Sequence, residues 1–370
     1  MSKILICAGG TGGGIYPALA VAHELEALGL SYDDLLWIGT QGEMEEELVP
    51  QAGIRLETIS GGAIVGVPLR VKVMNGLKLL KSIGTAYRLL GQFRPDAMLM
   101  TGGYMAVPVA LAARLRRVPI VIYLPDVEPG SAIKALMPVA HKVAVTTPGS
   151  AAYIPGHQMV VTGYPVRAEL RQALSLSRRE ALAQFELTLE RPTLFVFGGS
   201  RGAWNINKAL MAILPHLLAH YQVIHISGTL TWPQVEANLA HLSQAERAYY
   251  RPYPYLHRRM GAAFRAADLV VTRAGASMLG EAPAFGVPCV LVPLTFAWRY
   301  QKVNADFLTK AGTAVQLTDE TLDTALLATI KNLLDDEPRR QQMSAAARRL
   351  DKPEAARRLA QLVVEVGQGV

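Results

Sequence analysis

The chain has 370 residues, more than one hydrophobic core usually organises, so two domains are expected. By a broad count 51% of its residues are hydrophobic and 18% are charged, and no low-complexity tract is present, which excludes a disordered chain. The net charge is +7, and no uncharged run reaches the ~20 apolar residues that span a bilayer.

The first half of the chain alternates short apolar runs with helical patterns. Strands are predicted at residues 3–8, 35–38, 54–58, 97–100, 120–123 and 142–146. Helices are predicted from residue 15, near residue 43, and at residues 69–90, 107–115 and 131–136. This alternation is typical of right-handed βαβ units around a parallel sheet.

Proline and glycine interrupt the pattern at residues 152–167, which we interpret as an interdomain linker. A second alternation then begins, with strands at residues 193–197, 222–226, from 270, and at 289–292. Helices are predicted from residue 204, at residues 233–249 and 260–266, and from residue 322 to the end. We therefore expect two α/β domains, residues 1–162 and 163–352, with the helix at 353–370 packing back on the first.

Cations are concentrated in one part of the first domain. Between Thr58 and Pro125 there are nine Lys and Arg residues and the single acid Asp96, so this window carries +8. Such a patch suits an anionic surface, either nucleic acid or acidic lipid headgroups, although an ordinary solvated helix face has the same pattern. The two cysteines, Cys7 and Cys289, lie in apolar runs and no signal-peptide layout is seen, which favours a cytosolic protein.

Glycine-rich loops follow several predicted strands. The first spans residues 9–14, contains five glycines in six positions and leads into a helix marked by Pro17. It lacks the Gly-Lys-Ser/Thr of a Walker loop and the acidic residue of a dinucleotide fingerprint. Residues 101–104, 198–203 and 273–277 occupy the same position after a strand. Together these loops predict a cleft between two Rossmann-like domains that holds a phosphorylated ligand.

The stretch 270–306 contains two consecutive strand ends with polar residues after each. It delivers Arg273, Glu281 and Gln301 to the carboxyl edge of a parallel sheet, where open α/β folds bind ligands. A sugar nucleotide is the ligand that this combination favours.

These motifs, taken in order, resemble the MurG family of peptidoglycan N-acetylglucosaminyltransferases, which have the two-domain GT-B fold. The resemblance rests on residues 9–13, 16–18, 102–104, 163–167, 198–200, 227–228, 273–276 and 301–305. It implies transfer of GlcNAc from UDP-GlcNAc to lipid I, giving lipid II. It also implies a peripheral enzyme on the anionic cytoplasmic face of the membrane, without nucleic acid, cofactor or metal; no Asp-x-Asp motif is present.

The resemblance also assigns site residues. Arg167 and Ser200 would contact the donor diphosphate and Glu281 the ribose hydroxyls, while Gln301 would bind the donor sugar and Leu256 the uracil. The remaining predicted donor residues are Thr11, Gly12, Gly13, Arg273, Gly275 and Ala276. The acceptor and diphosphate loops would contribute Gly14, Gly102, Gly103 and Tyr104.

The chain departs from the family pattern on the acceptor side. Gly14 stands where the family has a histidine, Tyr123-Leu124-Pro125-Asp126 replaces His-Glu-Gln-Asn, and Tyr164 replaces the asparagine of Asn-Pro-Val-Arg. Inverting transfer needs a base for the acceptor hydroxyl. Our hypothesis is that Asp126 or Glu128 is that base; the alternative is that both cap the helix beginning near residue 130.

A polyprenyl acceptor implies membrane contact. The helix at residues 69–90 mixes apolar and basic side chains in a way that suits anionic lipid, and the expected patch is Lys72, Lys78, Leu79, Lys81, Ile83 and Arg88. Three functions stay open: the MurG-like transferase, a transferase with another lipid or glycolipid acceptor, and a UDP-GlcNAc 2-epimerase or silent UDP-sugar binding protein of the same fold.

Overall fold

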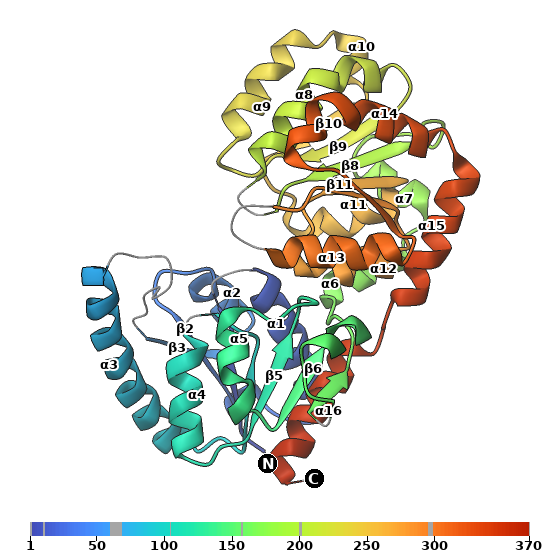
Figure 1. Ribbon diagram of the computed structural model, residues 1–370. Helices are drawn as coiled ribbons and strands as arrows, with labels where there is room; N and C mark the ends of the chain where they lie inside the picture. The colour runs from blue at the N-terminus through green and yellow to red at the C-terminus, as the bar shows by residue number, and fades with distance from the viewer. Residues whose placement is uncertain are drawn as a thin grey trace. The chain divides into compact units, whose positions relative to one another are not determined.

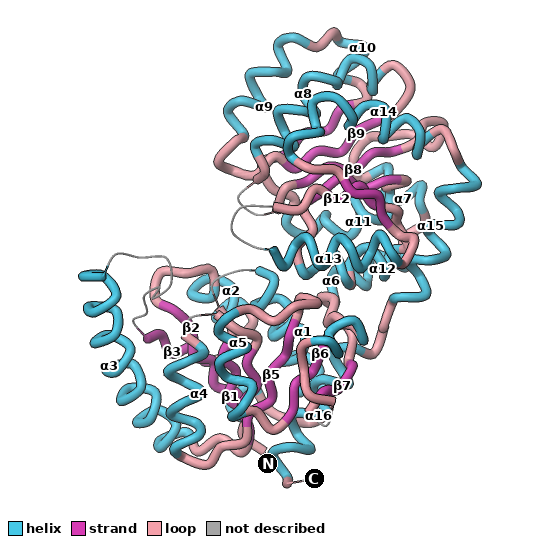
Figure 2. The backbone as a smooth tube through the Cα atoms, in the orientation of Figure 1, coloured by secondary structure: helices cyan, strands magenta, loops and turns pink. Residues whose placement is uncertain are grey.

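The computed structural model describes the chain except residues 1, 10–11, 60–68, 104, 157, 200–201, 295–298 and 370, and except the side chains of residues 69–79, 257 and 299. The chain forms two compact units (Figure 1). The first comprises Met1–Arg167 and Lys352–Val370, and the second comprises Ala168–Asp351. Each is a parallel sheet with helices on both faces, so the predicted α/β class is confirmed (Figure 2).

The sheet of the first unit has seven strands, and every strand pair described in it is parallel. Across the sheet they are β3 (Arg55–Ile59), β2 (Leu35–Thr40), β1 (Ile4–Cys7), β4 (Ala97–Met100), β5 (Ile120–Leu124), β6 (Lys142–Val145) and β7 (Met159–Val161). The apolar runs are continuous because both faces are covered.

Alternate residues of β1 point to opposite faces and enter two separate cores. Leu5 and Cys7 join the core beneath α3, α4 and α5, whereas Ile4 and Ile6 join the core beneath α1, α2 and α16. The carboxyl-terminal helix α16 packs against α1, β4 and β5 of this unit. The helices are α1 (Gly12–Ala27), α2 (Glu45–Gln51), α3 (Leu69–Phe93), α4 (Ala106–Leu115), α5 (Ser131–Leu136) and α16 (Ala355–Gln368).

The predicted linker at residues 152–167 is not a linker throughout. It contains β7, which pairs with β6, and the amides of Thr162 and Gly163 then donate to the Val145 carbonyl at 3.0 and 3.3 Å. The first unit therefore runs to Arg167 and not to residue 162. The strand has only three residues, too few to show an alternation between the flanking glycines.

The sheet of the second unit has six strands, all parallel in the described pairs. Their order is β10 (Tyr250–Tyr253), β9 (Gln222–Ile226), β8 (Thr193–Phe197), β11 (Leu269–Thr272), β12 (Cys289–Leu291) and β13 (Ala314–Gln316). The two edge strands β10 and β13 were not predicted. Pro252 inside β10 argues against a strand from sequence alone, and is tolerated because β10 lies at the edge.

Helices cover both faces of the second sheet. One face packs on α8 and α14, and the other carries an aromatic cluster in which Phe264 contacts Phe195, Phe197 and Phe285. The predicted helix at residues 233–249 is wrong as one element, because α9 and α10 are separated by a break around Leu242. The helices are α6 (Ala168–Gln172), α7 (Arg178–Ala183), α8 (Trp204–Leu218), α9 (Trp232–Asn238), α10 (Gln244–Arg247), α11 (Met260–Ala266), α12 (Glu281–Phe285), α13 (Arg299–Lys310), α14 (Leu322–Leu334) and α15 (Glu337–Leu350).

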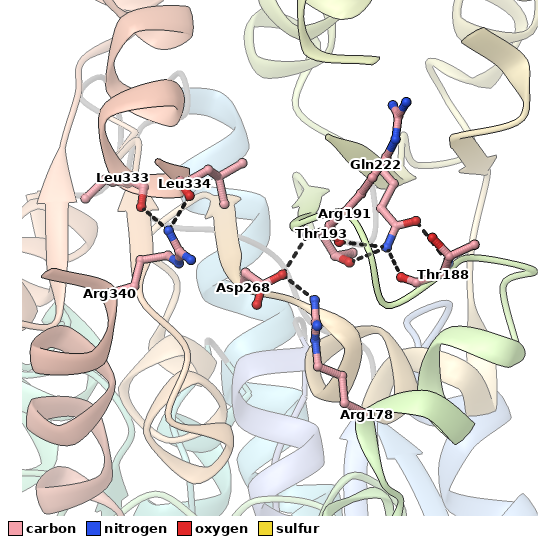
Figure 3. A network of polar contacts seen from close by, with 9 residues as sticks. All are labelled: Arg178, Thr188, Arg191, Thr193, Gln222, Asp268, Leu333, Leu334 and Arg340. Carbon is pink, nitrogen blue, oxygen red and sulfur yellow. Dashed lines mark hydrogen bonds and ion pairs between the residues drawn. The ribbon is translucent and has the colours of Figure 1, made fainter. Parts of the chain in front are cut away.

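Polar side chains close the amino edge of the second sheet (Figure 3). Asp268 accepts from the Thr193 amide at 2.7 Å and from Arg178 at 2.5 Å. The Gln222 amide donates to the Thr188 carbonyl at 2.7 Å and contacts the Thr193 hydroxyl at 2.9 Å. These contacts pair polar groups at the strand starts with one another. The opposite, carboxyl edge is therefore the better candidate for binding a ligand. No helix in the described part of the chain is long and apolar enough to cross a membrane.

Candidate functional site

The first sheet has a topological switch point between β1 and β4. From β1 the chain proceeds to β2 and β3 on one side, and then crosses to β4 on the other. The loops after β1 and β4 meet at the carboxyl edge, since a Cβ on Gly103 would lie 3.3 Å from the carbonyl oxygen of Gly9. Gly102 and Gly103 have φ of +106° and +88°, which glycine adopts without strain. Open α/β folds bind ligands at such a point.

The helix after the first loop begins at Gly12, earlier than the predicted start near residue 15. Gly12, Gly13 and Gly14 therefore form its first turn, where backbone amides have no partner within the helix. The Tyr16 ring packs on Gly12, whose Cβ would lie 2.9 Å from it. The Arg167 guanidinium carbon lies 4.0 Å from the centre of the same ring. A cation thus stands beside the start of a long helix, an arrangement suited to an anion.

Gly14 is packed against the end of β4. A Cβ on Gly14 would lie 2.9 Å from the Thr101 hydroxyl, closer than such contacts occur. That hydroxyl is buried and has no hydrogen-bond partner among the residues that the structure describes. The space that a side chain at residue 14 would need is therefore occupied by Thr101.

The two candidate bases lie in different environments. Glu128 is 1% exposed and accepts from Lys134 of α5 at 2.9 Å. Asp126 is partly exposed. The residue that caps α5 is Gly130, and Glu128 reaches that helix through Lys134. Tyr123, which replaces a family histidine, is fully buried in the core, and its hydroxyl lies 2.8 Å from that of Thr146.

The second sheet has an equivalent switch point between β8 and β11. Phe197 and Thr272 end these strands as paired neighbours, so the loops beginning at Gly198 and Arg273 start side by side. A Cβ on Gly198 would collide with Ala203, which explains why the turn into α8 requires glycine. The amides in the first turn of α8, a helix of 15 residues, have no partner within the helix, and amides of this kind bind phosphate.

Arg273 does not present a free charge at this edge. Its side chain is 10% exposed, and its Nη1 forms an ion pair with Asp319 at 2.9 Å and donates to the Val292 carbonyl at 3.1 Å. Arg273 thus has a structural role here, and its predicted part in donor binding stays a prediction. It ties the end of β11 to the ends of β12 and β13.

The remaining donor candidates lie on the elements after β10, β11 and β12. Glu281 is 6% exposed and begins α12, while Gly275 and Ala276 lie in the turn that precedes it. The Gln301 Oε1 accepts from the Leu294 amide at 3.0 Å, which orients the amide group of α13. Leu256 is 4% exposed and follows β10.

Several predicted residues lie outside the described part of the chain. Thr11, Tyr104 and Ser200 are not described, and for Lys72, Lys78 and Leu79 the structure describes the α3 backbone without the side chains. The described patch residues are Lys81 and Arg88, which are exposed, and Ile83, which is partly buried. Leu80 is 66% exposed on the same helix, and α3 packs on α4, where Leu115 is 67% exposed (Figure 1).

Two buried polar residues were missed from the sequence. Glu45 is fully buried, accepts from the Thr40 amide at 2.8 Å, and lies so close to Gly9 that a side chain there would collide with it. Asn304 is fully buried and donates to the Ala274 carbonyl at 3.1 Å. Glu45 stands in a run of acids that reads as an exposed helix start, so no sequence signal distinguishes it.

Comparison with known proteins decides the family. The sequence matches the glycosyltransferase family 28 N-terminal domain over residues 4–145 and the C-terminal domain of the same family over residues 193–361. A relative from Roseiflexus sp. (strain RS-1) is 38% identical, with 96% of this chain and 93% of the relative covered. The chain belongs to glycosyltransferase family 28. The Roseiflexus relative is named "UDP-N-acetylglucosamine--N-acetylmuramyl-(pentapeptide) pyrophosphoryl-undecaprenol N-acetylglucosamine transferase".

Within family 28 the chain groups with MurG. A relative of the same name from Halalkalibacterium halodurans is 34% identical over 99% of this chain and all of the relative. The crystal structure of Acinetobacter baumannii MurG matches with a TM-score of 0.78 and 28% identity, covering 99% of this chain and 100% of that one. The resemblance and the two-domain GT-B fold predicted from sequence are thus confirmed. A putative UDP-N-acetylglucosamine 2-epimerase from Listeria monocytogenes, at 15% identity and a TM-score of 0.67, shares the fold alone.

Proposed function

We propose that this family 28 enzyme transfers GlcNAc from UDP-GlcNAc to lipid I, the undecaprenyl-diphosphate-linked MurNAc-pentapeptide, and so forms lipid II. The observation that carries the proposal is the near full-length match to transferases that bear this name, at 34 and 38% identity. Each unit contributes a switch point lined by glycine loops, as a nucleotide-sugar transferase requires.

The second unit would bind the donor. The first-turn amides of α8 suit the diphosphate, and Glu281 at the start of α12 has two acceptor oxygens for the ribose hydroxyls. The Gln301 Oε1 faces the Leu294 amide, so Nε2 is the end of that side chain that would donate to the sugar. Leu256, after β10, is assigned to the uracil by resemblance.

The departing UDP needs its growing negative charge stabilised. Arg273 is paired with Asp319, so we assign this role to Arg167 together with helix amides. The Tyr16 ring fixes the Arg167 guanidinium, which reduces the conformational entropy lost on binding. We propose an inverting, metal-independent transfer on these grounds.

Of the two carboxylates, Asp126 is the better base. Glu128 is buried and forms an ion pair with Lys134, which keeps its carboxylate away from an incoming hydroxyl. Asp126 is partly exposed after β5, the strand next to β4. Glu128 then serves to fix the loop between β5 and α5.

The acceptor is anchored in lipid, so the first unit would lie on the anionic cytoplasmic face of the membrane without crossing it. The support is the face of α3 that exposes Leu80, Lys81 and Arg88. Residues 81 and 88 are seven apart and share one face of the helix. Nucleic acid is not a proposed partner.

A second candidate keeps the donor and changes the acceptor to another lipid or glycolipid. It is favoured by the altered first unit, where Gly14 puts no side chain in the first turn of α1 and Tyr123 is buried. UDP release measured with UDP-GlcNAc and lipid I, against UDP-GlcNAc with other polyprenyl-linked acceptors, separates the two. UDP release that occurs with lipid I and not with the other acceptors supports the first proposal. UDP release that occurs only with another acceptor supports the second proposal instead.

A further inference from the structure

A chain of hydrogen bonds lies buried beneath the carboxyl edge of the second sheet. The His225 Nδ1 lies 2.7 Å from the Tyr250 hydroxyl, and its Nε2 lies 3.0 Å from the Asn207 Oδ1. His225 and Asn207 are fully buried and Tyr250 is 3% exposed. The three residues come from β9, α8 and β10, so the hydrogen bonds connect three elements.

The partners of Asn207 fix where each proton lies. Its Nδ2 donates to the Ser227 carbonyl at 2.8 Å and to the Thr231 hydroxyl at 2.8 Å. A carbonyl only accepts, so the nitrogen end must face Ser227 and the oxygen end must face His225. The His225 Nε2 therefore carries the proton, and Nδ1 accepts from Tyr250. Burial lowers the pKa of His225 to about 3, which keeps the ring neutral.

At the Asn207 end, these hydrogen bonds reach the Ser227 carbonyl, which lies against Gly202. The Ser227 carbonyl accepts from Asn207 and also from the Thr231 hydroxyl at 2.7 Å. Gly202, at the end of the loop after β8, lies directly against this carbonyl, since a Cβ there would overlap the oxygen. Asn207 itself lies in the first turns of α8. The positions of Gly202 and of the start of α8 thus depend on where the Ser227 carbonyl is held.

We propose that His225 is a positioning residue for the diphosphate of the nucleotide sugar. By donating from Nε2 to Asn207, it holds the Ser227 carbonyl, and so Gly202 and the start of α8, in the arrangement that binds phosphate. The inference rests on the proposed function, because it assumes that this edge binds UDP-GlcNAc. Backbone amides bind an anion well only when they are fixed before it arrives.

The test compares UDP binding and steady-state kinetics of the full-length enzyme and its variants. His225→Phe leaves the Asn207 oxygen without its donor, and we expect roughly a tenfold or larger rise in the UDP Kd and the UDP-GlcNAc KM, with kcat within about threefold. His225→Gln retains an amide donor and should recover most of the affinity. The matched control is His241→Phe, at an exposed histidine of the same unit, with no change expected.

A second measurement does not depend on the variants. Nitrogen NMR of the histidine-labelled enzyme should show the His225 ring protonated on Nε2 and not on Nδ1. An unchanged UDP Kd in a folded His225→Phe variant, or a proton on Nδ1, would overturn the inference. If the wild-type enzyme itself fails to bind UDP, the proposed function falls and this inference with it. If the wild type binds and His225→Phe binds equally, the inference alone falls.

Discussion

The guanidinium of Arg167 stacks on the ring of Tyr16, with 4.0 Å between the guanidinium carbon and the ring centre. Arg167 ends the first of the two segments that form the first unit, and Tyr16 lies in α1, the helix that follows the first glycine loop. The contact brings a fixed positive charge to a helix start whose amides have no partner within the helix. It makes Arg167 the cation on which the proposed stabilisation of the leaving diphosphate depends.

The first prediction concerns this stacked pair. Arg167→Lys keeps the charge but loses the planar fork and much of the stacking, so kcat/KM for UDP-GlcNAc should fall at least about tenfold, or ~1.4 kcal/mol. Arg191→Lys is the matched control, because Arg191 stacks on Tyr249 at 3.6 Å in the second unit. Steady-state kinetics with both variants checks this. Equal kcat/KM in the Arg167→Lys enzyme and the wild type would remove Arg167 from the mechanism.

The second prediction separates the two carboxylates. Asp126→Asn should lower kcat by about 10²- to 10⁴-fold, as expected on losing a general base. Glu128→Gln should leave kcat within about tenfold but lower the melting temperature, because Lys134 loses its buried ionic partner. Single-turnover rates and thermal melts of both variants measure these effects. The assignment is reversed if Glu128→Gln abolishes turnover in a stably folded protein while Asp126→Asn remains active.

The third prediction concerns Gly14 and Thr101. The Thr101 hydroxyl is buried without a hydrogen-bond partner in the described structure, so Thr101→Val should be neutral or stabilising by about 1 kcal/mol. Gly14→Ala collides with that hydroxyl and should become more favourable by about 1 kcal/mol in a Thr101→Ala background. Denaturant unfolding of the double-mutant cycle measures the coupling. Gly84 has open space around it, so the effects of Gly84→Ala and Thr101→Ala on the free energy of unfolding should add. If the effects of Gly14→Ala and Thr101→Ala also add, the packing of Gly14 against Thr101 is contradicted.

The fourth prediction is a pH dependence of stability. Burial lowers the pKa of His225 from 6.5 to about 3, so below about pH 6.5 the unfolded chain binds a proton that the folded chain does not. The free energy of unfolding should therefore fall as pH falls from 6.5 towards 4, by up to about 1.4 kcal/mol per pH unit from this group. The slope of this free energy against pH should be shallower for His225→Gln than for the wild type. Parallel slopes for the two proteins would show that His225 binds its proton equally in the folded and unfolded states.

The fifth prediction concerns membrane contact. Lys81→Glu with Arg88→Glu reverses two exposed charges on α3, and each contributes about 1 kcal/mol near an anionic surface. Co-sedimentation with acidic phospholipid vesicles at low salt should drop by an order of magnitude or more, and wild-type binding should fall at high salt. Lys331→Glu with Arg339→Glu, at exposed sites of the second unit, is the control pair. Wild-type binding that is indifferent to salt would argue against the proposed surface.

The strands that sequence predicts well are those buried on both faces. Residues 97–100 and 193–197 were placed at their observed bounds because continuous apolar runs flanked by glycine leave little choice. The edge strands β7, β10 and β13 were missed for physical reasons, whereas the edge strand β3 was predicted. Pro252 is tolerated in β10 only because no neighbour lies beyond it, and β7 and β13 have three residues each. Their pairing depends on tertiary contacts that no local pattern carries.

The site was predictable as far as glycine loops mark it. The loops after β1, β4 and β8 could be located because glycine fits the turns and close approaches there, and the loop after β11 could be located by its small residues, although Gly275 has open space around it. Side-chain pairing could not be read from sequence. Nothing local shows that Arg273 is bound to Asp319, 46 residues later, or that Glu128 is buried with Lys134. The buried hydrogen bonds of His225 could not be predicted either, because its partners Asn207 and Tyr250 come from two other elements.

The central claim is that this chain moves GlcNAc from UDP-GlcNAc to lipid I. The most direct measurement incubates the purified full-length protein with UDP-GlcNAc, with and without lipid I, and quantifies released UDP together with the lipid product. We expect that UDP release requires lipid I and that one lipid II forms for each UDP released. UDP release that lipid I does not stimulate, or formation of UDP with no lipid II, would contradict it.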